Sequence, residues 1–322
     1  MKKVIFGGVG LFVLLPILAA GLIIITAYID ARYIELNWIK VEKVRIKCPP
    51  LAEPLKDVRI VFIADLHVRG KIGYRERRLV KIVNDLKPDI ILLGGDYIVE
   101  EDDLEASLEV LGNLQASQGV FGIRGDYEHV IFDQKELVQR LRRAGVILLM
   151  DETRKIRIGD RPPFYLLGVD VHRKVIDDLE RIMIDLPKEA PTLLLVHQPW
   201  VVEPASEMGI DLVLAGDIHG GQMGIAWIRE LTEDYARLKY VSGLYQVGNT
   251  LLYVTRGIGW THKQIRFLCR PEVTLIKIVK DGWADKPRVP KEFKGKSWLQ
   301  TVALKGWTRF KEIVGIHLMD GE

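Results

Sequence analysis

The sequence predicts an α/β protein, in which a sheet is largely covered by helices, preceded by a membrane-spanning helix. In the first half of the chain, short apolar runs alternate with segments of helical spacing, and apolar runs dominate the second half. Charged residues make up 28% of the chain and hydrophobic residues 48%, as in a folded globular protein. The 322 residues suffice for one large α/β domain or two small ones.

The first predicted element is an apolar run over residues 4–27 that contains no charged side chain. As a helix, these 24 residues would be about 36 Å long, enough to cross a hydrocarbon core. A cleaved signal peptide has an apolar region of roughly 7 to 15 residues, and no clear A-x-A site closes this run. We therefore expect an uncleaved anchor over residues 1–30, in the inner (plasma) membrane. Lys and Arg flank it on both sides, so the sequence leaves its orientation open.

The middle of the chain is predicted to be a linker followed by the main domain. Residues 31–57 form a polar connection, and its Cys48-Pro49-Pro50 sequence suits neither a helix nor a central strand. The domain is expected over residues 58–280. Its predicted strands are residues 58–64, 89–93, 119–123, 146–150, 164–168, 192–196, 212–215, 251–255 and 272–278. Its predicted helices are residues 74–86, 104–114 and 135–143.

The last segment, residues 281–322, starts as a basic linker that contains prolines and continues as an amphipathic helix from Trp298. Two placements remain open for this helix. It can pack on the domain, or it can lie in the membrane interface, which its Trp residues and the basic linker favour.

Charge and cysteine usage exclude several classes of protein. The net charge of +3 is too small for a dedicated nucleic-acid binder, so no nucleic-acid partner is expected. Cys48 and Cys269 lie outside any C-x-x-C spacing, which excludes a thiolate zinc site. We expect two free structural thiols, although a disulfide between them is compatible with the sequence.

Five of the predicted strands run directly into Asp or His residues. The sequences that follow them are Asp65-Leu66-His67, Gly94-Gly95-Asp96, Gly125-Asp126-Tyr127-Glu128-His129, His197 and Gly216-Asp217-Ile218-His219. Ligands of open α/β sheets gather at the carboxyl ends of the strands. Residues i and i+2 of an extended chain point the same way, so Asp65 and His67 can hold one ion together. Each sequence alone is more typical of a turn or a core histidine, but the five together predict a metal site.

This series resembles the calcineurin-like metallophosphoesterases in order, spacing and strand context, over about residues 58–278. Residues 220–222, 240–245, 253–259 and 266–272 resemble the bacterial membrane-anchored branch of that family. The branch includes phosphodiesterases and resembles enzymes that split UDP-2,3-diacylglucosamine in lipid A synthesis. The resemblance implies a fold of two packed mixed β-sheets flanked by helices.

The resemblance also implies two divalent metal ions. The first would be held by Asp65, His67, Asp96 and His219. Asp96 would bridge to the second, which is also held by Asp126, His197 and Asp217. Two such ions can activate a water molecule and clamp phosphoryl oxygens during in-line attack.

Three positions depart from the family pattern. Asp126 stands where Asn is usual, Tyr127 where a histidine close to the metal is found, and Asp217 where a metal-binding histidine is expected. Four carboxylates then bring the site close to neutrality. Their hard oxygen atoms favour Mn²⁺ or Mg²⁺. Because a less positive metal pair acidifies its water less, we expect slower hydrolysis or help from positive side chains.

Candidates for this help and for proton transfer lie near the motifs. Arg124 and Arg256 could supply positive charge, although each could equally be a surface residue. Tyr127 is a weak acid at neutral pH, because the pKa of tyrosine is about 10. His129 could supply the proton instead if its loop turns it inward, and His262 has the same status.

The sequence therefore predicts a hydrolase of phosphoester or pyrophosphate bonds at the membrane. The expected partner is a phosphorylated lipid or a small molecule, and UDP-2,3-diacylglucosamine is the most specific candidate. The alternative is a catalytically weak or inactive metal-binding module, tethered to the membrane, that recognises a phosphorylated lipid or protein.

Overall fold

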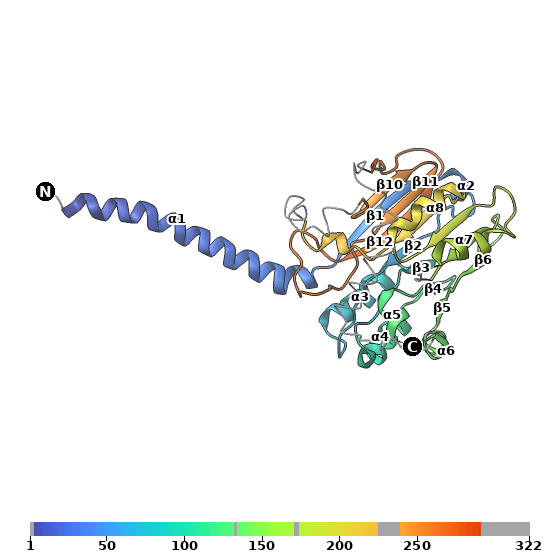
Figure 1. Ribbon diagram of the computed structural model, residues 1–322, viewed down its shortest axis with the longest axis horizontal. Helices are drawn as coiled ribbons and strands as arrows, with labels where there is room; N and C mark the ends of the chain where they lie inside the picture. Colours follow the sequence, from blue (N-terminus) through green and yellow to red (C-terminus); the bar gives the residue numbers. More distant parts are fainter. Residues whose placement is uncertain (1–2, 132–133, 171–173, 225–238, 291–322) are drawn as a thin grey trace, which may run out of the picture.

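The computed structural model of the protein describes residues 3–131, 134–170, 174–224 and 239–290. These residues form two six-stranded sheets with helices on their outer faces, and a long N-terminal helix projects from this body (Figure 1). The prediction of two mixed β-sheets flanked by helices is confirmed.

The first sheet contains the strands that end in the first three motifs. Its order is β1 (Lys40–Lys47), β12 (Glu272–Val279), β2 (Ile60–Ile63), β3 (Ile90–Leu93), β4 (Val120–Gly122) and β5 (Val146–Leu148). Strands β2 to β5 are parallel, whereas β12 is antiparallel to β2 and parallel to β1. The carboxyl ends of β2, β3 and β4 therefore lie at one edge of the sheet.

The second sheet carries the other two motifs. Its order is β10 (Gly243–Val247), β11 (Thr250–Val254), β9 (Leu212–Ala215), β8 (Thr192–Leu195), β7 (Phe164–Gly168) and β6 (Glu152–Ile156). The four central strands are parallel, and the strands at both edges, β10 and β6, are antiparallel to their neighbours.

Three apolar layers hold these elements together. Ile60 and Phe62 point into a core between the two sheets, whereas Val61 and Ile63 point into a core beneath the helices of the first sheet. Because both faces are buried, the strand is a continuous apolar run rather than an alternating one. A third core lies between the second sheet and its helices.

Helices complete the outer layers (Figure 1). Those of the first sheet are α3 (Tyr74–Asp85), α4 (Leu104–Gly112), α5 (Asp126–Ile131) and α6 (Gln134–Arg143). Those of the second sheet are α7 (Val175–Met183) and α8 (Val202–Glu207), and a short α2 (Pro49–Ala52) follows β1. Of these helices, α2, α5, α7 and α8 were not predicted.

All nine predicted strands are present, but β1, β6 and β10 were missed. Residues 40–47, expected as part of a polar linker, form the edge strand β1, in which Val44 and Ile46 are buried. Polar residues alternate with apolar ones along this edge strand, and its Lys, Glu and Arg residues interrupt the apolar run. A search of the sequence for continuous apolar runs therefore misses it. The predicted helix from Trp298 lies outside the described residues.

The two cysteines are free and buried, as expected. Burial raises the pKa of the Cys48 thiol to about 12 and also raises the pKa of Cys269. Both thiols are therefore protonated and unreactive, and they act as small core side chains.

The N-terminal apolar run is a helix, α1 (Lys3–Ile29), about 40 Å long. It continues through a π turn, η1 (Asp30–Ile34), and a 3₁₀ turn, η2 (Glu35–Asn37), directly into β1. Residues 14–37 have a mean hydropathy of 2.1 and form the one helical stretch in the described chain that is long and apolar enough to cross a membrane.

The N-terminal helix meets the first sheet at the edge that carries the motifs. Lys40, the first residue of β1, pairs with Glu272 at the start of β12, and Thr274 of β12 pairs with Phe62 near the end of β2. The residue at which the helix enters the sheet and the carboxyl end of β2 therefore lie at the same end of the strands.

Candidate metal centre

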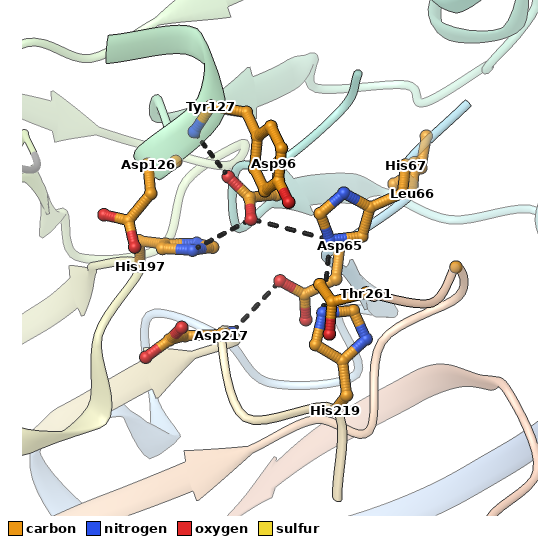
Figure 2. A network of polar contacts seen from close by, with 12 residues as sticks. Asp65, Leu66, His67, Asp96, Asp126, Tyr127, His197, Asp217, His219 and Thr261 are labelled. Carbon is orange, nitrogen blue, oxygen red and sulfur yellow. Dashed lines mark hydrogen bonds and ion pairs between the residues drawn. The ribbon is translucent and has the colours of Figure 1, made fainter. Parts of the chain in front are cut away.

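Seven side chains from both sheets converge at this edge (Figure 2). Asp65 and His67 follow β2, Asp96 follows β3, Asp126 is the first residue of α5 after β4, His197 follows β8, and Asp217 and His219 follow β9. They form three groups whose ligand atoms lie within 4.8 Å of one another: Asp65, His67 and His219; Asp65, Asp96 and His197; and Asp126, His197 and Asp217. The structure thus brings together all seven residues predicted to bind metal.

Five of the seven residues have a left-handed backbone. Their φ angles are 54° at Asp65, 41° at His67, 55° at Asp96, 70° at Asp217 and 53° at His219. This conformation costs roughly 1–2 kcal/mol for a residue with a Cβ. It lets each strand turn sharply at its end. Strain concentrated in this way indicates a functional site.

Glycines allow the turns of the first sheet to approach one another. Gly95 has a φ of 89°, and a Cβ added to it would lie 2.5 Å from the Gly125 nitrogen. A Cβ at Gly125 would collide with the Asp96 carboxylate. Both positions therefore require glycine, which explains why Gly95-Asp96 and Gly125-Asp126 occur as pairs.

The first half of the cluster contains His67, His219 and Asp65. The Nε2 atoms of the two histidines lie 3.1 Å apart, and their rings stack with centroids 5.0 Å apart. Burial lowers the pKa of His67 to about 4 and the pKa of His219 well below its ordinary value. Both imidazoles are therefore neutral, the form that binds metals.

The second half contains His197, Asp126 and Asp217. The Nδ1–H group of His197 donates to the Gly94 carbonyl over 2.7 Å, which directs Nε2 toward the cluster. Gln198 donates from Nε2 to Asp126 Oδ1 over 3.1 Å. These contacts orient an imidazole and a carboxylate toward the same point.

Asp96 lies between the two halves. Its Oδ1 accepts the Tyr127 N–H over 3.1 Å. Its Oδ2 is 3.5 Å from Nε2 of His67 and 3.4 Å from Nε2 of His197. This is the position that a bridging ligand would occupy.

The protonation of the carboxylates indicates a site built for cations. Burial, with repulsion from neighbouring carboxylates, raises the pKa of Asp65 to about 7, of Asp126 to about 6 and of Asp217 to about 8. Burial also tends to raise the pKa of Asp96, but His197 and His67 hold it below its ordinary value. The charge of His197 lowers the pKa of all three carboxyls, but it does not cancel the effect of their burial.

Three buried polar atoms of the cluster test whether metal ions fit. Among the described residues, Asp65 Oδ2, His67 Nδ1 and His197 Nε2 have no hydrogen-bond partner, and His197 Nε2 lies 3.4 Å from Asp96 Oδ2. Buried polar atoms are rarely left in this state, because each costs about 1–3 kcal/mol. Carboxylate oxygen and imidazole nitrogen are both ligands of divalent ions, so the residues fit a metal centre.

Glu128 supports the centre without belonging to it. Its buried carboxylate accepts the N–H groups of Asp96 over 2.8 Å, Tyr97 over 2.6 Å, Ile98 over 3.2 Å and Gly125 over 2.8 Å. It therefore ties the turn after β3 to the turn after β4. Its position three residues after Gly125, at the start of a helix, is the signal that sequence analysis could have used.

The predicted catalytic residues on α5 have different surroundings. The Tyr127 ring packs edge-on against His67, with centroids 5.1 Å apart, and burial raises the pKa of its hydroxyl. The expected loop around His129 is helical, so its side chain leaves the helix about 200° around the axis from that of Tyr127. The proton-donor role of His129 stays a prediction.

The two predicted arginines are paired with carboxylates of the protein itself. Arg124 is buried and paired with the Asp170 carboxylate, to which its Nε donates over 3.1 Å. Arg256 pairs with Glu42 over 3.1 Å and with Glu272 over 2.9 Å. Both guanidinium groups therefore balance carboxylates within the protein, and their expected help to the substrate stays a prediction. His262 is exposed.

Arg69 was missed by the sequence analysis. It is exposed, two residues after His67, and its guanidinium lies over the Trp260 ring, 5.6 Å from the centroid. Burial dominates the pKa shifts of His67 and Tyr127, and the charge of Arg69 also acts on both. It has no carboxylate partner in the part of the chain that the structure describes. Arg69 is therefore a cation beside the cluster that is available to an anion.

Fold and cluster together define a class of protein. Two mixed sheets flanked by helices, with carboxylates and histidines converging at strand ends, characterise metal-dependent phosphoesterases. A sequence model of the calcineurin-like phosphoesterase family matches residues 58–221, half of the chain. The chain belongs to this family, whose members are metal-dependent hydrolases.

Several relatives are similar over most of the chain. The chain is 27% identical to the uncharacterized metallophosphoesterase YkuE of Bacillus subtilis (strain 168), over 77% of this chain and 88% of the relative. It is 29% identical to the phosphodiesterase YaeI of Escherichia coli (strain K12), over 77% and 91%. A transmembrane protein with a metallophosphoesterase domain from Danio rerio is 28% identical, over 74% and 56%.

A solved structure aligns with the chain at low similarity. The protein TT1561 of Thermus thermophilus matches with a TM-score of 0.44 and 13% identity, over 62% of this chain and 90% of that chain.

Proposed function

We propose that this protein is a dinuclear hydrolase of phosphoester or pyrophosphate bonds that acts on a lipid-linked substrate at the membrane. The observation that carries the proposal is the cluster of seven side chains with Asp96 at its centre (Figure 2). Four carboxylates balance the charge of two divalent ions, and their oxygen atoms favour Mn²⁺ or Mg²⁺.

The residues divide between two ions. Asp65, His67 and His219 would hold one, and Asp126, His197 and Asp217 the other, with Asp96 between them. Such a pair, when bound, supplies an activated water nucleophile and Lewis-acid stabilisation of the phosphoryl oxygens.

Two further side chains would contact the substrate. The hydroxyl of Tyr127 remains protonated at neutral pH, because burial raises its pKa, so it can donate a hydrogen bond to a phosphoryl oxygen. The guanidinium of Arg69 can pair with a non-bridging phosphate oxygen, for which its planar donor geometry is suited.

The position of the apolar helix and the names of two relatives support a lipid-linked substrate. An apolar helix of transmembrane length leads directly into β1, and it meets the sheet at the edge that carries the cluster. One relative is named a phosphodiesterase, and another is named a transmembrane protein. A centre close to an inner-membrane anchor would reach head groups, and UDP-2,3-diacylglucosamine is the most specific candidate.

The test is hydrolysis by the full-length protein in detergent micelles with Mn²⁺. Bis-p-nitrophenyl phosphate and UDP-2,3-diacylglucosamine are compared for wild type, Asp96→Ala and the exposed control Asp102→Ala. We expect activity in wild type and control and none in Asp96→Ala. Preference for the lipid would support the specific substrate, and preference for the small diester would exclude it. Equal inactivity of all three proteins across several metals would contradict the enzyme proposal.

One observation favours a second function. The extra carboxylates Asp126 and Asp217 reduce the net positive charge that two ions would present, which weakens both phosphate attraction and water activation. A tethered module that binds metal and a phosphorylated lipid or protein, without turnover, remains the alternative. Tight Mn²⁺ binding without hydrolysis of either substrate would favour it.

A further inference from the structure

The end of the N-terminal helix is a buried part of the domain. Ala31 is 5% exposed, Glu35 4% and Leu36 2%, although they follow directly on an exposed apolar helix. The Ala31 carbonyl accepts the N–H of Arg266 over 3.0 Å. The Glu35 carboxylate accepts the N–H groups of Leu268, over 2.8 Å, and Cys269. The segment of residues 31–35, here called the brace, is therefore bonded to the loop of residues 256–269.

Arg266 organises the inside of that loop. It is fully buried, and its guanidinium donates to the carbonyls of Gly259 over 2.8 Å, Cys269 over 3.1 Å and Arg256 over 2.7 Å. Its Nη2 also lies 3.3 Å from Nδ1 of His219. One guanidinium thus gathers three carbonyls of the loop beside a predicted metal ligand. Lysine could not do the same, because its donors radiate from a single nitrogen atom.

The same loop holds the backbone of two ligand residues. The Gly259 N–H donates to the Asp65 carbonyl over 2.6 Å, and the Cys269 thiol lies 3.3 Å from the His219 carbonyl. Asp65 and His219 both have the strained left-handed backbone. A strained conformation persists only where its surroundings hold it, and here the loop is a large part of those surroundings.

We propose that the brace, through Glu35 and Arg266, positions the first half of the metal centre. The N-terminal helix is then more than a tether, because its buried end fixes the loop that holds Asp65 and His219 in ligand geometry. Arg266 and Glu35 are positioning residues that touch neither metal nor substrate. The inference rests on the proposed metal site but does not require that the site catalyse hydrolysis.

The experiment measures Mn²⁺ affinity of the full-length protein in detergent micelles, by calorimetry. The variants are Glu35→Gln, which replaces one acceptor oxygen by an amide group facing a backbone N–H, and Arg266→Lys. Glu53→Gln and Arg142→Lys, both at exposed positions, are the matched controls. We expect the dissociation constant to rise about tenfold to a hundredfold in both variants, as for other residues that orient metal ligands, and not in the controls.

Thermal melting in EDTA separates positioning from general stability. We expect Glu35→Gln to melt within a few degrees of wild type without metal and to bind the same number of Mn²⁺ ions as wild type at saturation. Wild-type Mn²⁺ affinity in Glu35→Gln would overturn it, and so would an equal loss in Glu53→Gln. If Arg266→Lys does not fold, Glu35→Gln decides alone. A wild type that binds Mn²⁺ without hydrolysis contradicts the proposed function and leaves this comparison intact.

Discussion

The two halves of the metal centre are built from different side chains and from different backbone conformations. The first half has two imidazoles, His67 and His219, and one carboxylate, Asp65. The second has one imidazole, His197, and two carboxylates, Asp126 and Asp217. Burial keeps the imidazoles of the first half neutral. In the second half, burial alone would lower the pKa of His197, but the charges of Asp96, Asp126 and Asp217 raise it well above its ordinary value.

The backbones of the two halves differ as well. All three ligand residues of the first half have a left-handed backbone, whereas in the second half only Asp217 does, and Asp126 begins the helix α5. Asp65 and Asp217 share this conformation with His67 and His219, so the turn does not itself dictate whether the ligand is a carboxylate or an imidazole. A nitrogen-rich half suits softer divalent ions, whereas an oxygen-rich half suits Mg²⁺ and Mn²⁺. We expect the second half to have the stronger preference for hard ions.

The largest expected effect comes from removing the residue that the halves share. Asp96→Asn keeps an oxygen for the Tyr127 N–H but loses the charge between the two sites. We expect hydrolysis of bis-p-nitrophenyl phosphate to fall by about a thousandfold or more, since metal stabilisation of the transition state contributes several kcal/mol. Steady-state kinetics in Mn²⁺ measure it, with the exposed Asp102→Asn as control. Activity within tenfold of wild type would show that the halves do not depend on Asp96.

The next test makes the second half resemble the family pattern. Asp126→Asn combined with Asp217→His replaces two carboxylates by neutral ligands and leaves the first half unchanged. A more positive pair of ions attracts phosphate better and acidifies bound water more, so we expect kcat/KM to rise by roughly tenfold, about 1.4 kcal/mol.

Metal preference provides the second readout of this variant. Competition titrations should show that the ratio of Co²⁺ to Mg²⁺ affinity rises relative to wild type, because nitrogen replaces oxygen. The single variant Asp126→Asn should move both quantities by less. A lower kcat/KM with unchanged metal preference would mean that the carboxylates are required for activity rather than a handicap.

The sequence predicts the positions of the ligands far better than their surroundings. All seven cluster residues could be found because apolar strands end in them, and strand ends gather at one edge of a sheet. The ion pairs of Arg124 and Arg256 could not be predicted, because their partners, Asp170 and Glu272, become neighbours only in the fold. Arg266 was missed for a similar reason, since its three acceptors are backbone carbonyls, which carry no sequence signal.

Protonation offers a third way to compare the halves. In the metal-free protein the pKa of Asp217 is raised by burial to about 8 and that of Asp65 to about 7, from an ordinary value of 3.8. Between about pH 6.5 and 8 the folded state then binds more protons than the unfolded chain, so its stability falls as pH rises. His67 and His219 oppose this trend only near pH 6.5, where the unfolded chain still protonates about half of each, whereas the raised pKa of His197 reinforces it.

We therefore expect the melting temperature in EDTA to fall by several degrees from pH 6.5 to pH 8. Saturating Mn²⁺ should remove or reverse the fall, because metal binds the deprotonated carboxylates. Thermal scans of the detergent-solubilised protein at the two pH values measure both effects. Asp217→Asn should flatten the EDTA curve more than the exposed control Asp102→Asn. A melting temperature that rises with pH in EDTA would contradict the assigned direction of these shifts.

The smallest expected effect is on substrate rather than metal, at Arg69 beside the first half. Arg69→Gln removes an exposed cation near His67 and Tyr127 without touching a ligand. An exposed ion pair contributes at most about 1 kcal/mol, so we expect KM for bis-p-nitrophenyl phosphate to rise about fivefold with kcat nearly unchanged. Arg142→Gln, a distant exposed arginine on α6, should leave both constants unaltered. The rise in KM should shrink in high salt, because ions screen an exposed charge but not a buried metal ligand. A fall in kcat at unchanged KM would instead place Arg69 in the transition state, and an effect that ignores salt would assign the loss to the Trp260 contact.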